Sequence, residues 1–271
     1  MKAAVGKTPC ALAIGGLDPG GGAGIAADLR AFAAAGVFGC AAVALVTVQS
    51  TAGLRSVRAI PAREVAAQAG EVLRHQRVRA VKVGALGSEA NVRAVARVLA
   101  KHPGVPVVVD TPMLPTRGKT RLLVERALAA LRDELLPRAT LVTVNADEAG
   151  ALLGEPVRTV GEAHDAARAL VKAGAHAVLV KGGHLGGPSA IDVLAIGGEV
   201  VELRARRLVM EAVHGTGCTL ASLIAGRLAA RVGMRVDAEG LVGAIRWAKR
   251  VHHGALARAV DVGGGMRVLV F

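Results

Sequence analysis

The chain has 271 residues and a formal net charge of +13, and hydrophobic residues make up 52% of it. This apolar content, with only 20% charged residues, excludes intrinsic disorder, and the length suits one large α/β domain. The three cysteines lie far apart, at Cys10, Cys40 and Cys218, which excludes a disulfide framework and indicates a reducing, cytoplasmic setting.

Short runs rich in valine, isoleucine and leucine alternate with amphipathic stretches along the chain. The predicted strands are 11–16, 40–48, 80–83, 105–110, 140–143 and 177–181. Helical patterns lie between them, at 24–35, 63–74, 89–101, 119–131, 146–153 and 161–173. This alternation is typical of right-handed βαβ units, which build a parallel sheet covered by helices on both faces.

The pattern changes after residue 181, where two strand-like runs, 190–196 and 200–204, are joined across Gly197 and Gly198. They predict an antiparallel hairpin at an edge of the sheet. Two helices, 217–231 and 238–259, complete the chain. We expect a single domain over residues 1–271, because no linker, repeat or low-complexity block separates two halves.

Charge and hydropathy bear on two classes of partner. Residues 31–54 carry no charge and are long enough to span a bilayer, but alanine and glycine dominate them. We interpret them as a helix end, a glycine turn and a buried strand, and expect no membrane association.

The positive charges are spread over the chain and tyrosine is absent. Solvated arginine-rich faces are therefore favoured over a nucleic-acid surface.

A glycine-rich segment, 15–24, follows the first strand, where ligands of doubly wound sheets bind. Residues 22–27 fit the G-x-G-x-x-A pattern, but the acidic residue that a nicotinamide site needs further on is missing. The glycines more simply bring backbone close to another ligand, with Asp28 nearby, and a flexible turn is the alternative. The Gly-Lys-Thr triplets at Gly6 and Gly118 lack the first glycine of a Walker A loop.

The strongest local signal is the segment 214–219, His-Gly-Thr-Gly-Cys-Thr, which opens a long apolar helix. Glycines before a helix expose consecutive backbone N–H groups, and the helix dipole adds positive charge, so an anion such as a transferring phosphoryl group is stabilised there. Cys218 falls in the first turn, where a thiolate is favoured. The alternative is a small buried residue that packs the helix start.

Polar side chains also follow two later strands. Asn145 and Glu148 lie three residues apart at a helix start, where an amide and a carboxylate could hold magnesium-bound water beside phosphates. The alternative is that both only cap the helix. Lys181, followed by two glycines, ends another strand with a cation that suits a polyphosphate.

Together these segments resemble the ribokinase-like superfamily, and most closely its hydroxymethylpyrimidine/phosphomethylpyrimidine kinase branch. The matching segments are 16–25, 28–29, 83–84, 110–113, 145–148, 181–184 and 214–219. The resemblance implies a three-layer α/β/α sandwich with a mostly parallel central sheet and an antiparallel edge hairpin. It also implies ATP-dependent phosphorylation of 4-amino-5-hydroxymethyl-2-methylpyrimidine and then of its monophosphate, in thiamine biosynthesis.

The resemblance further implies a role for each matching residue. Cys218 would be the catalytic base near the substrate hydroxyl, and the anion hole for the γ-phosphoryl group would include the backbone of Gly215, Thr216 and Gly217. ATP contacts are implied for Lys181, Asn145 and Thr219, and magnesium contacts for Glu148, Asn145 and Asp110. The pyrimidine pocket would be lined by Gln49, Asp28, Gly16, Ala85 and Pro112. The Gln49 amide suits an aminopyrimidine because it donates and accepts at once.

Two pocket positions depart from the family's pattern. Ala85 stands where the family usually has methionine, and Pro112 where it often has valine. A wider pocket at Ala85 keeps a pyridoxal or pyridoxine kinase open as an alternative. A non-catalytic ligand-binding regulator on the same fold is a further alternative, which should have lost part of the anion hole. Because relatives are commonly dimers, we expect a homodimer.

Overall fold

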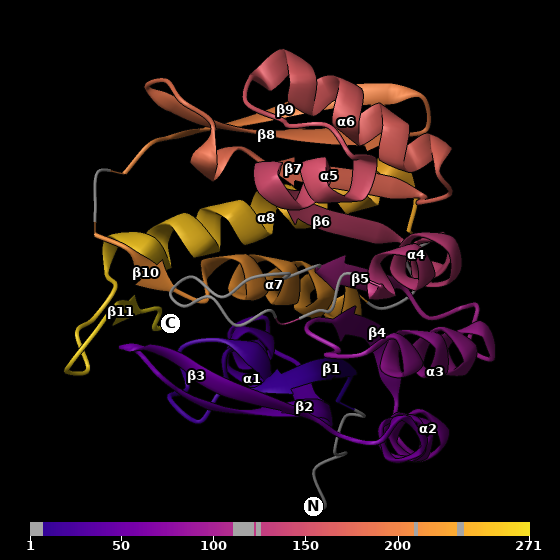
Figure 1. The fold of residues 1–271 in the computed structure, drawn as a ribbon. Coiled ribbons are helices and arrows are strands. Elements are labelled where there is room, and N and C mark those ends of the chain that lie inside the picture. Colours follow the sequence, from indigo (N-terminus) through magenta and orange to yellow (C-terminus); the bar gives the residue numbers. More distant parts are fainter. Residues whose placement is uncertain (1–7, 111–121, 123–125, 209–210, 232–235) are drawn as a thin grey trace, which may run out of the picture.

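A central sheet of nine strands organises the computed structural model, which describes residues 8–110, 122, 126–208, 211–231 and 236–271. The strand order is β3-β2-β1-β4-β5-β6-β7-β8-β9, and Figure 1 shows it running from bottom to top. The strands are β1 (Cys10–Leu17), β2 (Phe38–Ser50), β3 (Gly53–Ala59), β4 (Val78–Val83), β5 (Val107–Asp110), β6 (Leu141–Asn145), β7 (Ala177–Lys181), β8 (Ser189–Ile196) and β9 (Glu199–Arg206). The strands from β2 to β7 in this order are parallel, whereas β3, β8 and β9 pair antiparallel.

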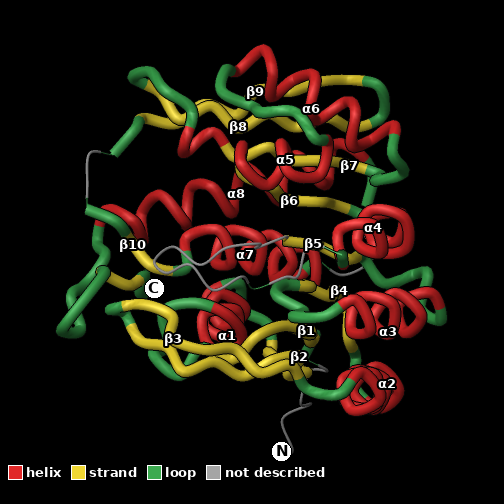
Figure 2. Tube along the Cα trace, viewed as in Figure 1, coloured by secondary structure: helices red, strands yellow, loops and turns green. Residues whose placement is uncertain are grey.

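Helices cover both faces of the sheet (Figures 1 and 2). One core packs under α2 (Ala62–His75), α3 (Glu89–Ala100), α4 (Ala127–Ala130), α5 (Ala146–Leu153) and α6 (Val160–Lys172). The other packs under α1 (Gly24–Ala34), α7 (Thr216–Ala230) and α8 (Ala238–Ala257). Strand β1 shows why both faces are apolar, because Leu12 and Ile14 enter the first core and Ala11 and Ala13 the second. The predicted three-layer sandwich is confirmed.

The predicted edge hairpin is also confirmed. Strands β8 and β9 pair antiparallel beyond β7, and both glycines of their turn, Gly197 and Gly198, have positive φ, as a two-residue turn of this type requires. Sequence patterns missed the antiparallel strand at the opposite edge. Strand β3 buries only Leu54 and exposes Arg55 and Arg58, so it has no apolar run to reveal it.

Two other segments differ from the sequence expectation. The first part of the predicted helix 119–131 lies mostly outside the described residues. Its described part, α4, continues as a π-helical turn, Leu131–Leu135, and a 3-10 turn, Leu136–Arg138. A small parallel sheet, β10 (Val213–His214) with β11 (Arg267–Val268), is too short for periodicity to predict. Within the described ranges, no helix has the length and apolar character needed to cross a bilayer.

Candidate active site

The carboxyl ends of the parallel strands meet at one edge of the sheet, where they and the start of α7 line a cavity of about 1000 Å³. This volume is at the upper end of ligand pockets and leaves room for two small molecules. The sequence-predicted residues that line it are Gly16, Asp28, Gln49, Ala85, Asp110, Asn145, Glu148, Lys181, Gly215, Thr216, Gly217 and Cys218.

Two predicted contacts are not found at this cavity. Pro112 lies outside the described residues. Thr219 is buried inside the protein and is not among the residues that line the cavity, so the structure does not support its predicted side-chain contact with ATP. The reason is the helical period: one position after Cys218 the side chain points to another side of α7, toward the core.

The start of α7 has the backbone geometry that we expect of an anion-binding cradle. Gly215 has a φ of 73°, and a Cβ there would lie 2.1 Å from the carbonyl oxygen of Gly22, so only glycine lets the helix start sit against the glycine-rich loop. No side chain of the described residues caps this helix, which leaves its first N–H groups facing the cavity. A Cβ on Gly217 would lie 3.1 Å from the Lys181 Nζ, so an ammonium adjoins the cradle.

Sheet register brings the polar residues of β5, β6 and β7 together. Asp110 pairs with Thr143, and Asn145 pairs with Lys181, on adjacent strands. The Lys181 Nζ lies 2.9 Å from Asp110 Oδ1 and 3.8 Å from Glu148 Oε2. Burial alone would lower the pKa of Lys181, but the attraction of Asp110 and Glu148 raises it, so the lysine is charged. Burial would likewise raise the pKa of Asp110, and Lys181 holds it below its usual value.

Asn145 and Glu148 form a capping box at the start of α5. The Glu148 N–H donates to Asn145 Oδ1, and the Asn145 N–H donates to Glu148 Oε2, each over 2.8 Å. Both residues therefore cap the helix, as one of the two interpretations expected, while their predicted magnesium contact stays a prediction. Burial raises the pKa of Glu148 to about 7, against the attraction of Lys181, so this carboxylate lacks compensating positive charge. A cation brought by a ligand would supply that charge.

Cys218 differs from the sequence expectation in its ionisation. Burial raises the pKa of its thiol to about 12, although the attraction of Lys82 works in the opposite direction. This direction is opposite to the expected stabilisation of a thiolate at the helix start: desolvation is the largest cause, and the nearby carboxylates of Asp110 and Asp28 also oppose ionisation, although the Cys218 side chain is only half-buried and lines the cavity.

Asp28 is bound inside the protein instead of being open to a substrate ring. It is 0% exposed, and its two oxygens lie 2.9 and 3.0 Å from the Nζ of Lys82, which is itself buried. The Ser222 hydroxyl donates to Asp28 Oδ1 over 2.6 Å. Asp28 therefore pairs with Lys82 and Ser222 at the wall of the cavity, and its expected direct contact with the substrate stays a prediction. Sequence reasoning missed Lys82, although a lysine within an apolar strand is a signal in itself.

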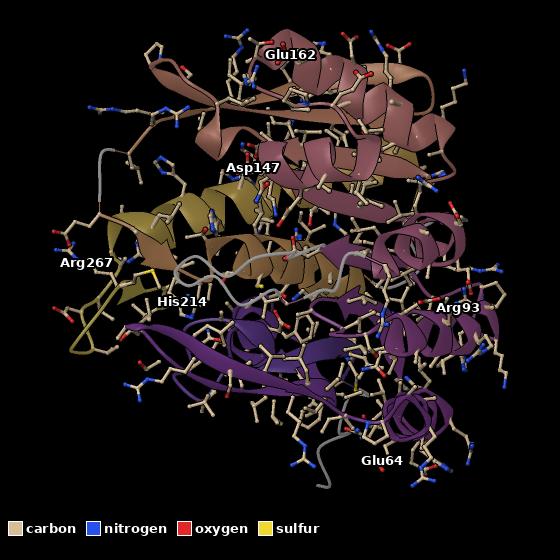
Figure 3. The ribbon with its side chains drawn as sticks, viewed as in Figure 1. Glu64, Arg93, Asp147, Glu162, His214 and Arg267 are labelled. Carbon is tan, nitrogen blue, oxygen red and sulfur yellow. The ribbon has the colours of Figure 1, made fainter. Side chains whose placement is uncertain are left out.

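A second polar chain crosses the other end of the cavity, and sequence reasoning missed two of its members. His214 Nε2 lies 2.9 Å from Asp18 Oδ2 and 2.9 Å from the amide nitrogen of Gln49. Asp18 and His214 are each 3% exposed. Figure 3 labels His214, which lies beside the end of the β2–β3 hairpin. The predicted residue Gln49 is thus held by a partner that is distant in sequence.

Comparisons with known proteins identify the family to which the chain belongs. The phosphomethylpyrimidine kinase family model matches residues 18–269. A hydroxymethylpyrimidine/phosphomethylpyrimidine kinase of Rhizobium meliloti is 41% identical over 263 residues, which cover 95% of each chain. The structure of Bacillus subtilis pyridoxal kinase in an ADP complex superposes with a TM-score of 0.86 at 28% identity, covering 97% of both chains. Phosphomethylpyrimidine kinase from Clostridium difficile gives a TM-score of 0.76 at 29% identity, covering 92% of this chain and 99% of that one.

The family match spans nearly the whole chain and includes the anion cradle, the capping box and Lys181. The solved structures share the layered sheet on which these groups are placed. The resemblance seen in the sequence is confirmed, and the chain belongs to the phosphomethylpyrimidine kinase family of phosphotransferases.

Proposed function

We propose that this protein phosphorylates 4-amino-5-hydroxymethyl-2-methylpyrimidine with ATP, and then phosphorylates the monophosphate, in thiamine biosynthesis. One observation carries this proposal: the same cavity is lined by the anion cradle at residues 215–218, by the Lys181 ammonium beside it, and by the Gln49 amide at the end of β2, which suits a heteroaromatic ring. The relative from Rhizobium meliloti, at 41% identity, carries the name of this activity.

In the proposed reaction, the substrate hydroxyl oxygen forms a bond to the γ-phosphorus while the bond from that phosphorus to the ADP oxygen breaks. The electron pair of the broken bond leaves with ADP. The N–H groups at the start of α7 stabilise the charge on the transferring phosphoryl oxygens. Lys181 exchanges part of its contact with Asp110 for the nucleotide phosphates, since its Nζ already adjoins Gly217.

Cys218 is our proposed acceptor of the hydroxyl proton, because it lies in the first turn of α7 beside the cradle and lines the cavity. Accepting a proton requires the thiolate, and burial holds the pKa of this thiol at about 12. Lys82 is a positive charge that favours the thiolate. Only a small fraction of the protein is therefore in the reactive form near neutral pH, and we expect turnover to rise with pH.

Magnesium is part of this proposal. No group of three or more histidine, cysteine or acidic side chains in the described ranges could hold a metal ion alone. The oxygens of Asp110 and Glu148 nevertheless fit a hard cation that arrives with phosphates and keeps waters as ligands. The raised pKa of Glu148 points the same way, because it marks a carboxylate short of positive charge. When bound, magnesium would neutralise negative charge on the nucleotide phosphates.

A pyridoxal kinase activity is the second candidate, because the Bacillus subtilis pyridoxal kinase superposes with a TM-score of 0.86 and because Ala85, a small residue, lines the cavity. The non-catalytic regulator has no comparable support, since the cradle residues Gly215 to Cys218 are all present. We also propose a homodimer in the cytoplasm; the free thiols of Cys10, Cys40 and Cys218 fit a reducing compartment. Light scattering on the purified protein tests the dimer.

A substrate panel tests the function. Purified protein with Mg-ATP is assayed for ADP release with the hydroxymethylpyrimidine, its monophosphate, pyridoxal and pyridoxine, and kcat/KM is compared. We expect the pyrimidines to lead, and no ADP release above background with either of them would refute the proposal. The Cys218→Ala variant should lose about 10²–10⁴-fold in kcat with nearly unchanged KM for ATP, as expected for the loss of a proton acceptor.

A further inference from the structure

One guanidinium group, that of Arg207, binds most of the backbone carbonyl groups of a loop beside the cavity. The loop, residues 182–188, joins β7 to β8 and contains four glycines among its seven residues. The acceptors of the Arg207 side chain are the carbonyl oxygens of Gly182 (3.4 Å), Gly183 (2.6 Å), Leu185, Gly187 (2.8 Å) and Ser189 (3.3 Å). Arginine suits this task because it carries five N–H donors in one rigid plane.

The packing of the rest of the protein fixes only the start of this β7–β8 loop. The Gly182 N–H donates to Asp192 Oδ1 over 2.8 Å, and a Cβ on Gly182 would lie 1.8 Å from the carbonyl oxygen of Ile191. On each of the other three glycines, a Cβ would meet no described atom within 4 Å, and Leu185 is the loop side chain that enters the core. Since glycine loses the most backbone entropy on ordering, the loop depends on Arg207 for its conformation.

The loop borders the part of the cavity that lies away from Gln49. Lys181 precedes the loop directly, and the cavity lining continues past it with Gly183, Ala190 and Leu208. Five steps of about 4.8 Å, or roughly 24 Å, separate β2, which carries Gln49, from β7 in the sheet. A nucleotide with its phosphates between the anion cradle and Lys181 therefore extends along the β7–β8 loop, while the acceptor ring lies at the other end.

We propose that Arg207 is a positioning residue for the nucleotide, which holds the β7–β8 loop in the conformation that places the Gly183 backbone beside Lys181 at the cavity. Arg207 acts through the loop, because all three of its side-chain nitrogens donate to backbone carbonyl groups. These bonds also turn carbonyl oxygens toward a cation, so their partial negative charge is compensated before a polyphosphate arrives. The inference rests on the proposed function for the nucleotide, but the link between Arg207 and the loop does not.

Three variants separate geometry from charge. Arg207→Ala removes the guanidinium, whereas Arg207→Lys keeps the positive charge but places all its donors on one nitrogen, which cannot reach carbonyl groups spread along the loop. Arg204→Ala is the matched control, because it removes the same charge from β9. The Arg204 side chain is 67% exposed, pairs with Glu202 over 2.7 Å and is not among the described residues that line the cavity.

Hydrogen–deuterium exchange of the nucleotide-free protein, followed by mass spectrometry, tests the link to the loop. The Leu185 N–H donates to the Gly182 carbonyl oxygen over 3.2 Å, and in Arg207→Ala we expect it to exchange about tenfold faster or more. Peptides that cover β1 and β6 should keep their wild-type rates, as Arg204→Ala should throughout. Unchanged exchange in the loop overturns the proposal. This result does not depend on what the enzyme phosphorylates, so it separates the inference from the proposed function.

Kinetics and calorimetry test the consequence for the nucleotide. In Arg207→Ala and Arg207→Lys we expect the KM for ATP and the Kd for Mg-ADP to rise about tenfold, while the KM for the hydroxymethylpyrimidine stays within about twofold. Arg204→Ala should keep all three values. A wild-type KM for ATP in Arg207→Lys means that charge alone suffices and overturns the proposal. A raised KM for ATP in Arg207→Ala without faster exchange in the loop means that Arg207 contacts the nucleotide itself, which also overturns it.

Discussion

Replacing Lys82 by methionine removes the charge from the most deeply buried ion pair of the active site while keeping an unbranched side chain. In the wild type, the Lys82 Nζ lies within 3.0 Å of both Asp28 oxygens, and neither residue reaches solvent. The Coulomb attraction of Asp28 raises the pKa of Lys82 against the effect of burial, whereas burial raises the pKa of Asp28 against the attraction of Lys82. The distances of 2.9 and 3.0 Å from one Nζ to both oxygens are those of an ion pair. After the substitution, the hydrogen bond from Ser222 is the one that Asp28 keeps among the described residues.

The expected loss of folding free energy in Lys82→Met follows from the burial of Asp28, which water cannot reach. Removing one partner of a buried ion pair costs about 3–5 kcal/mol, because the other charge stays buried without compensation. For a chain of this length, that loss lowers the melting temperature by about 6–10 °C. The double variant Lys82→Met/Asp28→Leu replaces the whole pair by apolar groups, and we expect its free energy of unfolding within about 2 kcal/mol of the wild type.

Equilibrium urea denaturation followed by circular dichroism measures both variants, and equal m-values show that the folded and unfolded states are comparable. A loss below about 1 kcal/mol in the single variant would refute the argument from burial. A double variant no more stable than the single one would show that lost packing, and not the uncompensated charge, is responsible.

Two further predictions concern the part of the cavity where we place the nucleotide. Gly215→Ala should abolish turnover and lower the free energy of unfolding by about 2 kcal/mol or more, because a Cβ would lie 2.1 Å from the Gly22 carbonyl oxygen and because φ is positive. Gly70→Ala in α2, where a Cβ meets nothing within 4 Å, is the matched control, and activity assays and urea denaturation measure both variants. The pKa of Glu148, about 7, predicts that kcat/KM for Mg-ATP falls more steeply below pH 7 than above it, because the carboxylate takes up a proton in addition to the thiolate of Cys218. In Glu148→Gln the change of slope near pH 7 should disappear, and a change of slope that persists would exclude Glu148 as its cause.

Local sequence patterns were sufficient for the elements that carry the site. Strand β7 and helix α5 have the predicted bounds at both ends. The bounds of α5 follow from Asn145, which caps its start, and from Gly154, which ends it with a φ of 81°. Strand β3 was not predicted because most of its residues are exposed to solvent and form no apolar pattern. Strands β10 and β11 were not predicted because each has only two residues.

The interactions among the site residues join positions that lie far apart in the sequence, which no local sequence pattern can predict. His214 meets Asp18 across 196 positions and Gln49 across 165, and Lys82 meets Asp28 across 54. These contacts exist because β1 lies between β2 and β4 and because β10 brings His214 to the end of β2. The burial that raises the pKa of Cys218 likewise comes from the packing of several elements around one sulfur atom.

Composition, periodicity and the segment around Cys218 were thus enough to establish the layered α/β fold and to locate a phosphate-binding cradle. Those features arise from residues a few positions apart, whose side chains share one face of a helix or strand. The folded chain alone decided that Asp28 pairs with Lys82, that burial raises the pKa of the Cys218 thiol and that His214 contacts Gln49. Burial and hydrogen-bond partnership are properties of neighbours in space, which the order of strands in the sheet brings together.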